Sequence, residues 1–449
     1  MSTERIIQQI KDSDHNKVKV AVTDIDGVLR GKLMLKEKFL SAAESGFGFC
    51  DVVFGWDVAD QSYDNADVTG WHTGYPDAIA RIDLDTFRRV PWDEDIPFFL
   101  GDFSQNNTKG LICPRTLLKN IAEQAKDTGF DPVFSQEFEW FNFEETPETF
   151  ADKNFINPKP LSPGMFGYSM LRSSENSGFF NDLFDLLERF GVPLEGLHTE
   201  TGPGVYEAAI RYSDILLAAD RATLFKTGVK EIAYKHGLMA SFMAKPSQEL
   251  PGCSGHVHQS LWSDDKNAFY DAKDPDGMSA TMRSYMAGQL ACLPYILPML
   301  APTINSYKRL VEGAWAPTTI TWGIDNRTTA LRALPDSEQS TRLETRVVGS
   351  DVNPYLAMSA CLAAGLYGIK KDMKLDIEKT AGNGYRDEKN GTLPVDLRSA
   401  TAQMKASDIP NELFGEDFVN HFVKTREWEC RQFDKAVTNW EMKRYFEII

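Results

Sequence analysis

The chain has 449 residues, of which 42% are hydrophobic and 25% charged, as expected for a protein of two or three domains around a large core. Its 65 Asp and Glu outnumber its 48 Lys and Arg, and the net charge of −17 argues against nucleic acid and anionic membranes as partners, because both attract a positive surface. The six Cys form no CxxC pair, the first residues are polar, and no apolar run reaches the roughly 18 residues of a membrane span, so we expect a cytoplasmic protein without a disulfide framework.

The N-terminal quarter of the chain has the pattern of a short helix followed by strands. Ile6, Ile7 and Ile10 give residues 3–11 one apolar side, and strand-like segments separated by Gly, Asp and Pro fill about 18–100. The pattern changes near 107–112. We therefore predict two domains, residues 1–108 and residues 109–449.

The stretch VAVTDIDGVLRGK, residues 20–32, has two interpretations. An apolar strand followed by Asp24 and Asp26 is typical of phosphatases of the haloacid dehalogenase type, in which the first Asp attacks phosphorus. Alternatively, the valines and Asp24 lie on one face of an ordinary strand, and Asp26-Gly27 forms its turn. The rest of the chain has to decide between them.

Strands and helices alternate after the predicted boundary. Pro114 suits the first turn of a helix that Gly129 ends, and residues 131–143 read as a strand. Residues 213–237 and 353–371 read as two further long helices, each preceded by a capping side chain. The second of these helices is small and apolar on all sides, which predicts that it is buried.

Two acidic motifs are candidates for metal binding. In SQEFEW, Glu137 and Glu139 are two residues apart on an apolar strand, so both carboxylates project from one face. Paired acids are common on exposed strand faces, but the aromatic neighbours here indicate a core strand, where the pair needs a cation to neutralise it. In HTETGPGVYEAAI, Glu200 and Glu207 bracket a Gly-Pro-Gly turn that could bring them together.

Two further motifs add histidine and arginine. In GCSGHVHQSLW, His256 and His258 share a strand face at a spacing common in metal sites, although one of them could be a hydrogen-bonded core residue. In RLETR, Glu344 alternates with Arg342 and Arg346 on one face. This pattern fits a salt-bridge row, or a metal ligand beside guanidinium groups that hold an anion.

Three more arginines, Arg309, Arg327 and Arg332, indicate a local anion site in a chain of net negative charge. Oxygen-rich ligands suit Mg²⁺ or Mn²⁺ rather than structural zinc. Arginine together with a divalent metal is how proteins stabilise phosphoryl transfer. The residues therefore predict a metal- and ATP-dependent enzyme acting on an anionic substrate, and they do not name that substrate.

In their order along the chain, these motifs resemble the glutamine synthetase superfamily (type I-like), and in pattern they are most similar to its γ-glutamyl-amine and polyamine ligases. The resemblance covers nearly the whole chain and is densest at QEFEWF, HTETGPGVYE, GCSGHVHQSLW, NSYKRL, WGIDNRTTALR and RLETRVVGSDVNPYLA. It implies an α+β chain with an N-terminal β-grasp domain and a large glutamine synthetase catalytic α/β domain. VTDIDGVLRGK then resembles the first strands of the β-grasp domain, and the phosphatase interpretation is dropped.

The resemblance also assigns site residues, position by position. Two to three Mg²⁺ or Mn²⁺ ions are implied for each site, with ATP as co-substrate. The implied ligands are Glu139, Glu200 and Glu207 for one ion, and Glu137, His256 and Glu344 for the second. Gly252 and Arg309 fall at the glutamate substrate, Ser260 at the nucleotide, and Arg327, Arg332 and Arg346 around the ATP phosphates and the transferred phosphoryl group. Arg309, Arg327 and Arg346 are the catalytic candidates, and Arg346 also contacts substrate.

The acceptor side of the site departs from the family. Trp315 stands where glutamine synthetases place a glutamate that guards ammonium, and DVVFGWDVAD replaces their ammonium-binding DGSS loop, with neither Asp51 nor Asp57 a convincing substitute. We expect Phe54, Trp56 and Trp315 to line the acceptor pocket, since aromatic rings attract cations and pack against alkyl groups. Such a pocket suits an organic amine better than ammonium.

The implied reaction is the ATP-dependent ligation of the glutamate γ-carboxylate to an organic amine through a γ-glutamyl phosphate. An ammonia-using glutamine synthetase is the alternative, and a catalytically inactive relative carries least weight because all six metal ligands are present. Family active sites lie between subunits, so we expect a homo-oligomer, either a hexameric ring or a dodecamer. We further expect residues 380–394 to form an exposed loop, in which the altered surroundings of Tyr385 argue against the adenylylation known in the family.

Overall fold

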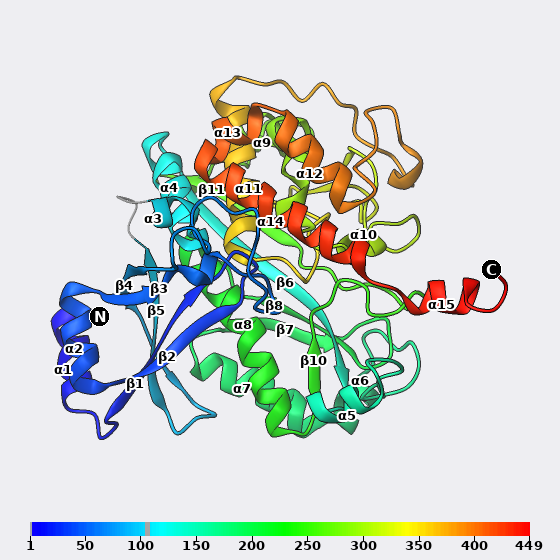
Figure 1. Ribbon diagram of the computed structural model, residues 1–449. Helices are drawn as coiled ribbons and strands as arrows, with labels where there is room; N and C mark the ends of the chain where they lie inside the picture. The colour runs from blue at the N-terminus through cyan, green and yellow to red at the C-terminus, as the bar shows by residue number, and fades with distance from the viewer. Residues whose placement is uncertain (1, 104–107) are drawn as a thin grey trace.

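The computed structural model describes residues 2–103 and 108–449 and arranges them around two β-sheets (Figure 1). The smaller sheet has the strand order β2-β1-β5-β4-β3, in which β1 and β5 are parallel and the other neighbours antiparallel. This is the arrangement expected of a β-grasp domain. Its elements are α1 (Thr3–Lys11), β1 (Lys17–Thr23), β2 (Leu29–Leu35), α2 (Lys36–Ser45), β3 (Phe47–Cys50), the short 3₁₀ helix η1 (Asp51–Phe54), β4 (Asp77–Val90) and β5 (Ile96–Phe103). The predicted helix at 3–11 is confirmed as α1, which buries Ile6 and Ile10.

The turn between β1 and β2 attaches the smaller sheet to the rest of the molecule. The Asn353 side chain donates hydrogen bonds to the carbonyl oxygens of Asp24 and Ile25, at 3.1 and 3.2 Å. The Arg426 guanidinium lies 2.6 Å from the Asp26 carboxylate. Gly27 has a φ of 84°, and a Cβ there would lie 2.9 Å from the Cα of Asn353, so the turn needs glycine for close approach. The two aspartates therefore hold two parts of the fold together.

The predicted boundary between residues 108 and 109 follows directly after residues 104–107, which lie outside the described part of the chain. Hydrophobic packing crosses this region in both directions. Ile25 and Leu100 belong to the large core, while Ile112 and Cys113 belong to the core of the smaller sheet. The boundary itself remains a prediction.

The larger sheet forms the body of the molecule and runs in the order β13-β14-β15-β11-β6-β8-β7. These strands are β6 (Asp131–Phe143), β7 (Leu194–Thr199), β8 (Val205–Ile210), β11 (Val257–Ser263), β13 (Trp322–Ile324), β14 (Leu331–Leu334) and β15 (Arg342–Thr345). The short strands β9 (Ser213–Asp214) and β10 (Met239–Ser241) pair with β6, and β12 (Lys266–Asn267) pairs with β11. The central strand β6 is the strand predicted at 131–143, and it carries both glutamates of the SQEFEW motif.

Helices cover this sheet and extend away from it (Figure 1). The predicted helices are confirmed as α4 (Pro114–Asp127), α8 (Ile215–Lys235, capped by Asp214) and α11 (Pro354–Lys370, capped by Asn353). The others are α3 (Thr108–Ile112), α5 (Pro147–Asp152), α6 (Met170–Glu175), α7 (Ser177–Arg189), α9 (Ala280–Leu300), α10 (Ser306–Arg309), η2 (Gly384–Arg386), α12 (Leu397–Ala406), α13 (Ile409–Phe414), α14 (Glu416–Lys435) and α15 (Asn439–Tyr445). Within the described residues, none of these helices combines the length and apolarity that crossing a membrane requires.

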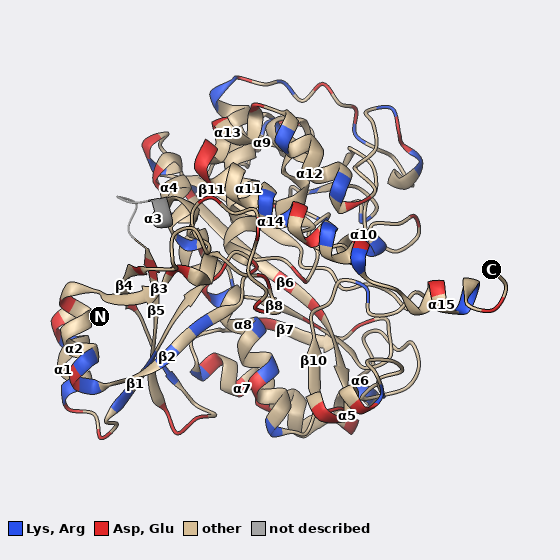
Figure 2. Cartoon of the chain, in the orientation of Figure 1, with Lys and Arg blue, Asp and Glu red and all other residues tan. Residues whose placement is uncertain are grey.

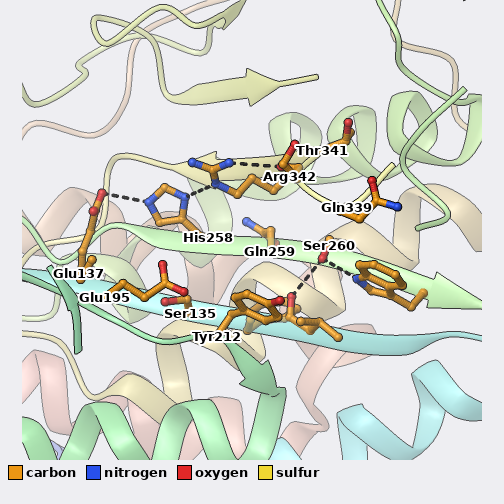
Figure 3. A pocket seen from close by; sticks show the side chains of 15 residues that line it. Ser135, Glu137, Glu195, Tyr212, His258, Gln259, Ser260, Gln339, Thr341 and Arg342 are labelled. Atoms are coloured by element: carbon orange, nitrogen blue, oxygen red, sulfur yellow. Dashed lines mark hydrogen bonds and ion pairs between the residues drawn. The ribbon is translucent and has the colours of Figure 1, made fainter. Parts of the chain in front are cut away.

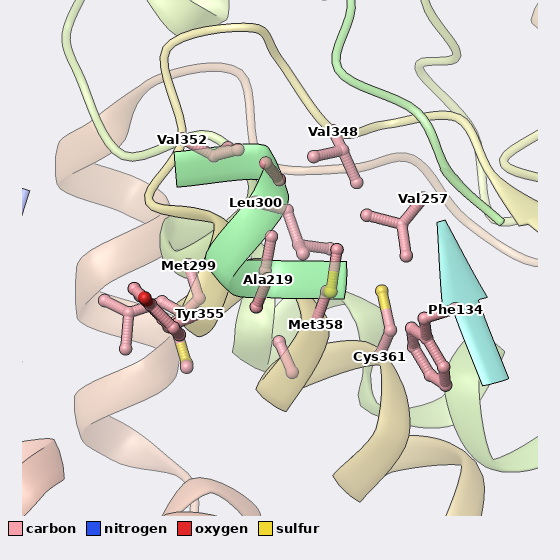
Figure 4. Packing of buried hydrophobic residues seen from close by; sticks show 14 of the residues in the cluster. Phe134, Ala219, Val257, Met299, Leu300, Val348, Val352, Tyr355, Met358 and Cys361 are labelled. Carbon is pink, nitrogen blue, oxygen red and sulfur yellow. The ribbon is translucent and has the colours of Figure 1, made fainter. Parts of the chain in front are cut away.

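Helices α9 and α11 pack closely because both carry glycine where they cross. A Cβ on Gly288 would lie 2.3 Å from the Ala364 carbonyl oxygen, and one on Gly368 would lie 2.0 Å from that of Ser284. Figure 4 shows the core beside this crossing, where Met358 and Cys361 of α11 point toward Val257 and Phe134 of the sheet. The burial predicted for the helix at 353–371 is confirmed, and the tight packing fixes the strands that carry the site.

Candidate active site

The site begins on β6, whose two faces differ in chemistry. Phe138 and Trp140 are fully buried against α8, and Glu137 and Glu139 alternate with them on the opposite face. The register pairs Glu139 with Glu207 of the neighbouring strand β8. Acidic positions consequently gather on the central strands, visible as red segments near β6 and β8 in Figure 2. The expectation that the two glutamates share a face is met.

One half of the acidic site joins β6 to β11 and β15. The His256 Nδ1 atom lies 3.1 Å from Glu344 Oε1 and 3.5 Å from Glu137 Oε1, and His258 Nε2 lies 2.9 Å from Glu137 Oε1. Arg342 Nε can only donate, and it lies 3.3 Å from His258 Nδ1, so the ring accepts at Nδ1 and carries its proton on Nε2 (Figure 3). Both histidines of the HxH motif therefore reach the glutamates, and Glu137, His258 and Glu344 are close enough together to hold one metal ion.

Positive groups compensate this half of the site. Arg332 Nη1 lies 2.9 Å from Glu344 Oε2, and Arg346 forms an ion pair with the other oxygen. Burial raises the pKa of Glu344, but the hydrogen bond from His256 and the nearby charges outweigh burial and bring the pKa below its usual value. Glu137 behaves in the same way: its pKa is lowered because His258 and His256 outweigh burial. Both carboxylates are therefore ionised and balanced within the chain.

The other half of the site is dominated by acids. His198 of β7 lies 3.5 Å from Glu207 Oε2 and 3.9 Å from Glu200 Oε2, and these three residues form a second group able to hold a metal ion. Burial raises the pKa of Glu207 to about 10, and repulsion from Glu139, Glu137, Glu200 and Glu344 adds to the effect. A cluster of half-buried carboxylates without basic partners other than His198 among the contacts recorded in the described chain fits a hard divalent cation such as Mg²⁺ or Mn²⁺.

Four of the predicted arginine and glycine positions surround these carboxylates. Arg346 donates through Nε to the Arg327 carbonyl oxygen at 3.1 Å, which attaches the exposed Arg327 loop to the site. Arg309 is 2% exposed, and its Nη atoms donate to the carbonyl oxygens of residues 346–348. A Cβ on Gly252 would lie 2.7 Å from Arg309 Cγ, so the two predicted glutamate-binding residues are neighbours. Their contacts to substrate stay predictions.

A pocket of about 290 Å³ opens beside the compensated half of the site (Figure 3). Ser260, Tyr212, Arg342 and Trp262 line it, and Glu137 lies at its edge. The Trp262 Nε1–H donates to the Ser260 hydroxyl at 3.0 Å. Ser260 was predicted at the nucleotide, and it lies in a pocket that offers aromatic surface, a hydroxyl and a guanidinium next to the acidic cluster.

The predicted acceptor residues do not form one pocket within this chain. Phe54 is fully buried in the core of the smaller sheet, 5.1 Å from the Phe103 ring centroid, so its assignment to a substrate pocket is wrong. Trp56 is half-buried, and the Arg30 guanidinium lies 5.0 Å from the centroid of the Trp56 ring. Trp315 is 64% exposed in a loop and has a φ of 56°.

The aspartates near Phe54 are structural. The Asp57 carboxylate accepts hydrogen bonds from the backbone N–H groups of Ala59 and Gln61 and from Trp428 Nε1 at 2.9 Å. Asp51 is buried and accepts a hydrogen bond from the Thr69 hydroxyl at 2.5 Å. Both carboxylates thus have protein partners that explain their positions.

Two residues of the site region were not predicted. His198 stands two positions before Glu200 in HTETG, on the same strand face, so the period of two was a usable signal. Tyr385 lies in the segment 380–394 that was expected to be exposed; most of the segment is exposed, but Tyr385 is 8% exposed and packed inward. No local pattern distinguishes this tyrosine from a surface residue.

Comparisons with known proteins agree with this geometry. The family model described as "Glutamine synthetase, catalytic domain" matches residues 111–445. A protein named type-1 glutamine synthetase 2, from Dictyostelium discoideum, is 55% identical over 99% of this chain and 86% of its own. A glutamate–isopropylamine ligase from Pseudomonas sp is 37% identical over the full length of both chains. A solved GmaS/ADP complex superposes with a TM-score of 0.84 at 26% identity, covering 98% of this chain and 99% of that one.

Proposed function

The chain belongs to the glutamine synthetase family, and we propose that it joins the γ-carboxylate of glutamate to an organic primary amine. The coarser activity, an ATP-dependent ligase that forms a C–N bond with the help of divalent metal ions, is that of the family as a whole. The proposal concerns which nitrogen compound is the acceptor.

One observation carries the proposal: Trp315 stands, exposed, where ammonium-using family members are expected to place a glutamate. Ammonium has to be held by carboxylates and lose a proton before it attacks. Trp315 offers only a ring, while the Asp57 carboxylate is already occupied by protein donors. An organic amine brings apolar surface that an indole ring can cover. The named activity of the 37% identical relative, with isopropylamine, supports this choice.

The chemistry has two steps. The γ-phosphoryl group of ATP passes to a γ-carboxylate oxygen of glutamate, which gives ADP and an acyl phosphate. The amine nitrogen then attacks the acyl carbon, the bond to phosphate breaks, and the nitrogen loses a proton to give the γ-glutamylamide. We assign the nucleotide to the pocket at Ser260, and the phosphoryl group to Arg327, Arg332 and Arg346, whose charges stabilise it as it transfers.

The two acidic groups suit Mg²⁺ or Mn²⁺. Glu139, Glu200 and Glu207 would hold one ion, and Glu137, His256 and Glu344 the second, with His198 and His258 adjoining them. Bound divalent ions neutralise phosphate charge and orient the reacting carboxylate. The chain contributes carboxylates fixed on neighbouring strands, so little reorganisation is needed when the ions bind.

We also propose that the working form is a cytoplasmic homo-oligomer, a hexameric ring or a dodecamer, with sites shared between subunits. Support comes from the positions of the two aromatic residues: Trp56 lies between β3 and β4, beside the Arg30 guanidinium, and forms no aromatic ring pair with Trp315 among the described residues. A neighbouring subunit would supply the second aromatic wall. Light scattering combined with activity assays tests this, and a fully active monomer would overturn it.

A second candidate function, ammonia-using glutamine synthetase, is favoured by the name of the 55% identical relative. The two candidates differ in kcat/KM for ammonium against methylamine, longer alkylamines, ethanolamine, putrescine and aniline, measured at saturating ATP and glutamate. Burying two or three CH₂ groups at about 0.8 kcal/mol each predicts a roughly ten- to fiftyfold preference for the better amines.

Two substitutions of Trp315 distinguish the effect of losing the indole ring from the effect of gaining a carboxylate. Trp315→Ala removes the ring and is expected to weaken amine use alone, whereas Trp315→Glu is expected to weaken amine use and also improve ammonium use. If ammonium has the highest kcat/KM in the wild-type protein, the amine-ligase proposal fails and the chain is a glutamine synthetase.

A further inference from the structure

The segment between α11 and α12 crosses the loop that carries Trp315. Residue Thr319 forms an isolated β-bridge with Thr392, and the backbone N–H groups of Leu393 and Ile320 donate to Thr318 and Gly391 at 2.8 and 3.0 Å. In Figure 1 the segment is the orange trace beside the region of α10. The Trp315 loop is therefore held from outside by a part of the chain that has no family motif in it.

The same segment is also tied to the Arg327 loop. The Gly384 N–H donates to the Thr328 hydroxyl at 2.8 Å, and the Thr319 hydroxyl donates to the Gly384 carbonyl oxygen at 2.7 Å. A Cβ on Gly384 would lie 2.5 Å from the Thr328 carbonyl oxygen, so the approach requires glycine. One residue thus joins the loop on the acceptor side to the loop on the phosphoryl side.

Tyr385, the next residue, is buried near the Trp315 loop. Its side chain is 8% exposed, and its hydroxyl makes no hydrogen bond of ordinary geometry within residues 2–103 and 108–449. Burial raises the pKa of the phenol, while the charges of Arg346 and Arg309 and the amides of Trp315 and Ala316 act in the opposite direction. A buried hydroxyl that is close to the amides of the Trp315 loop and is influenced by the charges of Arg346 and Arg309 calls for a functional or structural explanation.

We propose that Tyr385 is a positioning residue for the acceptor: it supports the Trp315 loop and thereby sets where the attacking nitrogen meets the glutamyl group beside Arg309 and Arg346. The hydroxyl completes its hydrogen bonding when substrate fills the site. This inference rests on the ligase chemistry of the proposed function, but it holds for either acceptor, ammonium or amine.

The test is Tyr385→Phe, assayed with whichever acceptor the wild-type protein prefers. The variant removes a hydroxyl that makes no hydrogen bond of ordinary geometry within the described chain, so its Tm should stay close to that of the wild-type protein. Its KM for the acceptor should rise about three- to tenfold, the effect of one lost hydrogen bond, while KM for ATP stays unchanged. Tyr206→Phe is the matched control, because Tyr206 is also buried with an unpartnered hydroxyl but faces the core; it should alter none of these values.

A second variant tests the loop rather than the hydroxyl. Gly384→Ala pushes the segment away from Thr328, and its acceptor KM should rise more than that of Tyr385→Phe. An unchanged acceptor KM in Tyr385→Phe overturns the proposal, as do equal rises in KM for acceptor, glutamate and ATP. An ammonium preference of the wild-type protein defeats only the proposed amine function, because Tyr385 is then tested with ammonium.

Discussion

The two halves of the acidic site contain similar ligands but differ in their charge balance. Around Glu137 and Glu344, two arginines supply positive charge from the chain itself and two histidine rings lie within hydrogen-bond reach of the carboxylates. Around Glu207, the carboxylates repel one another and His198 is the nearest basic group recorded in the described chain. The first half can therefore form during folding without metal, whereas the second is costly to fold until a divalent cation arrives.

The largest expected effect is a loss of turnover, and we expect it to be equally large for substitutions in either half of the site. Glu139→Ala and His256→Ala each remove one of the proposed metal ligands, and each should lower turnover by about a thousandfold or more, since bound metal supplies several kcal/mol at the transition state. Glutamate- and acceptor-dependent ADP release measures this. Wild-type activity that survives excess EDTA would contradict metal dependence in both halves.

The second effect, on stability without metal, should separate the halves. Glu344→Ala leaves the buried Arg346 without its carboxylate and the half-buried Arg332 with Asp325 alone, and should lower the free energy of unfolding by about 3–5 kcal/mol. Glu207→Gln removes the cost of keeping Glu207 protonated in the folded state and should raise the free energy of unfolding at neutral pH. Thermal unfolding in EDTA compares the two variants with the wild-type protein. Equal destabilisation of both variants would show that the difference in charge balance between the two halves does not affect stability.

The third effect is a loss of stability with rising pH that comes from Glu207 in the acid-rich half. Because the pKa of Glu207 is raised from 4.5 to about 10, the folded metal-free protein keeps a proton that the unfolded chain releases across this window. Its stability should therefore fall as pH rises from about 4.5 to about 10, with a slope of up to about 1.4 kcal/mol per pH unit. Glu137 and Glu344, whose pKa values are lowered, stabilise above 4.5 and lose that effect only as pH falls through their folded values.

Glu207→Gln is the control for this slope, because it has no proton to keep. Urea unfolding in EDTA at several pH values gives both slopes. If the variant keeps the wild-type slope above pH 5, a group other than Glu207 causes the slope. The proposed difference in charge balance between the two halves would then not explain it.

The smallest effect concerns His198, which adjoins Glu200 and Glu207 and stacks on Tyr168 with ring centroids 4.3 Å apart. His198→Gln should raise the Mg²⁺ concentration needed for half-maximal activity about tenfold, as removal of groups that orient metal ligands does. His236→Gln, whose ring pairs with Asp182 away from the site, is the matched control. An identical Mg²⁺ requirement in both variants would remove His198 from the site.

Much of the catalytic frame could be predicted because it depends on local patterns. The period of two placed Glu137 and Glu139 on one face, and Asn353-Pro354 marked the start of α11. These signals act over a few residues. Resemblance to the family then supplied the ligand pairs that lie far apart in the chain.

The failures depend on packing between distant segments. Phe54 looks like a pocket residue in its motif, yet its ring is buried because η1 packs against β5, where Phe103 lies. Tyr385 is buried because a loop without regular structure crosses Thr319 and Thr328. The aspartates of DIDG resemble a nucleophile until Asn353 and Arg426, more than three hundred residues away, prove to be their neighbours. In each case the partner lies too far along the chain for a local pattern to show it.

The contact between Asp26 and Arg426 also has a consequence for synthesis. The two residues are 400 positions apart, so at about 5–20 residues per second Arg426 leaves the ribosome about 20 to 80 s after Asp26. Until then the nascent smaller sheet cannot dock on α14, and the Asp26 carboxylate stays in water. The contact between Asp26 and Arg426 therefore forms only after α14 has left the ribosome. A premature stop codon before α14 would therefore prevent the smaller sheet from docking through Asp26, although that sheet itself was synthesised correctly.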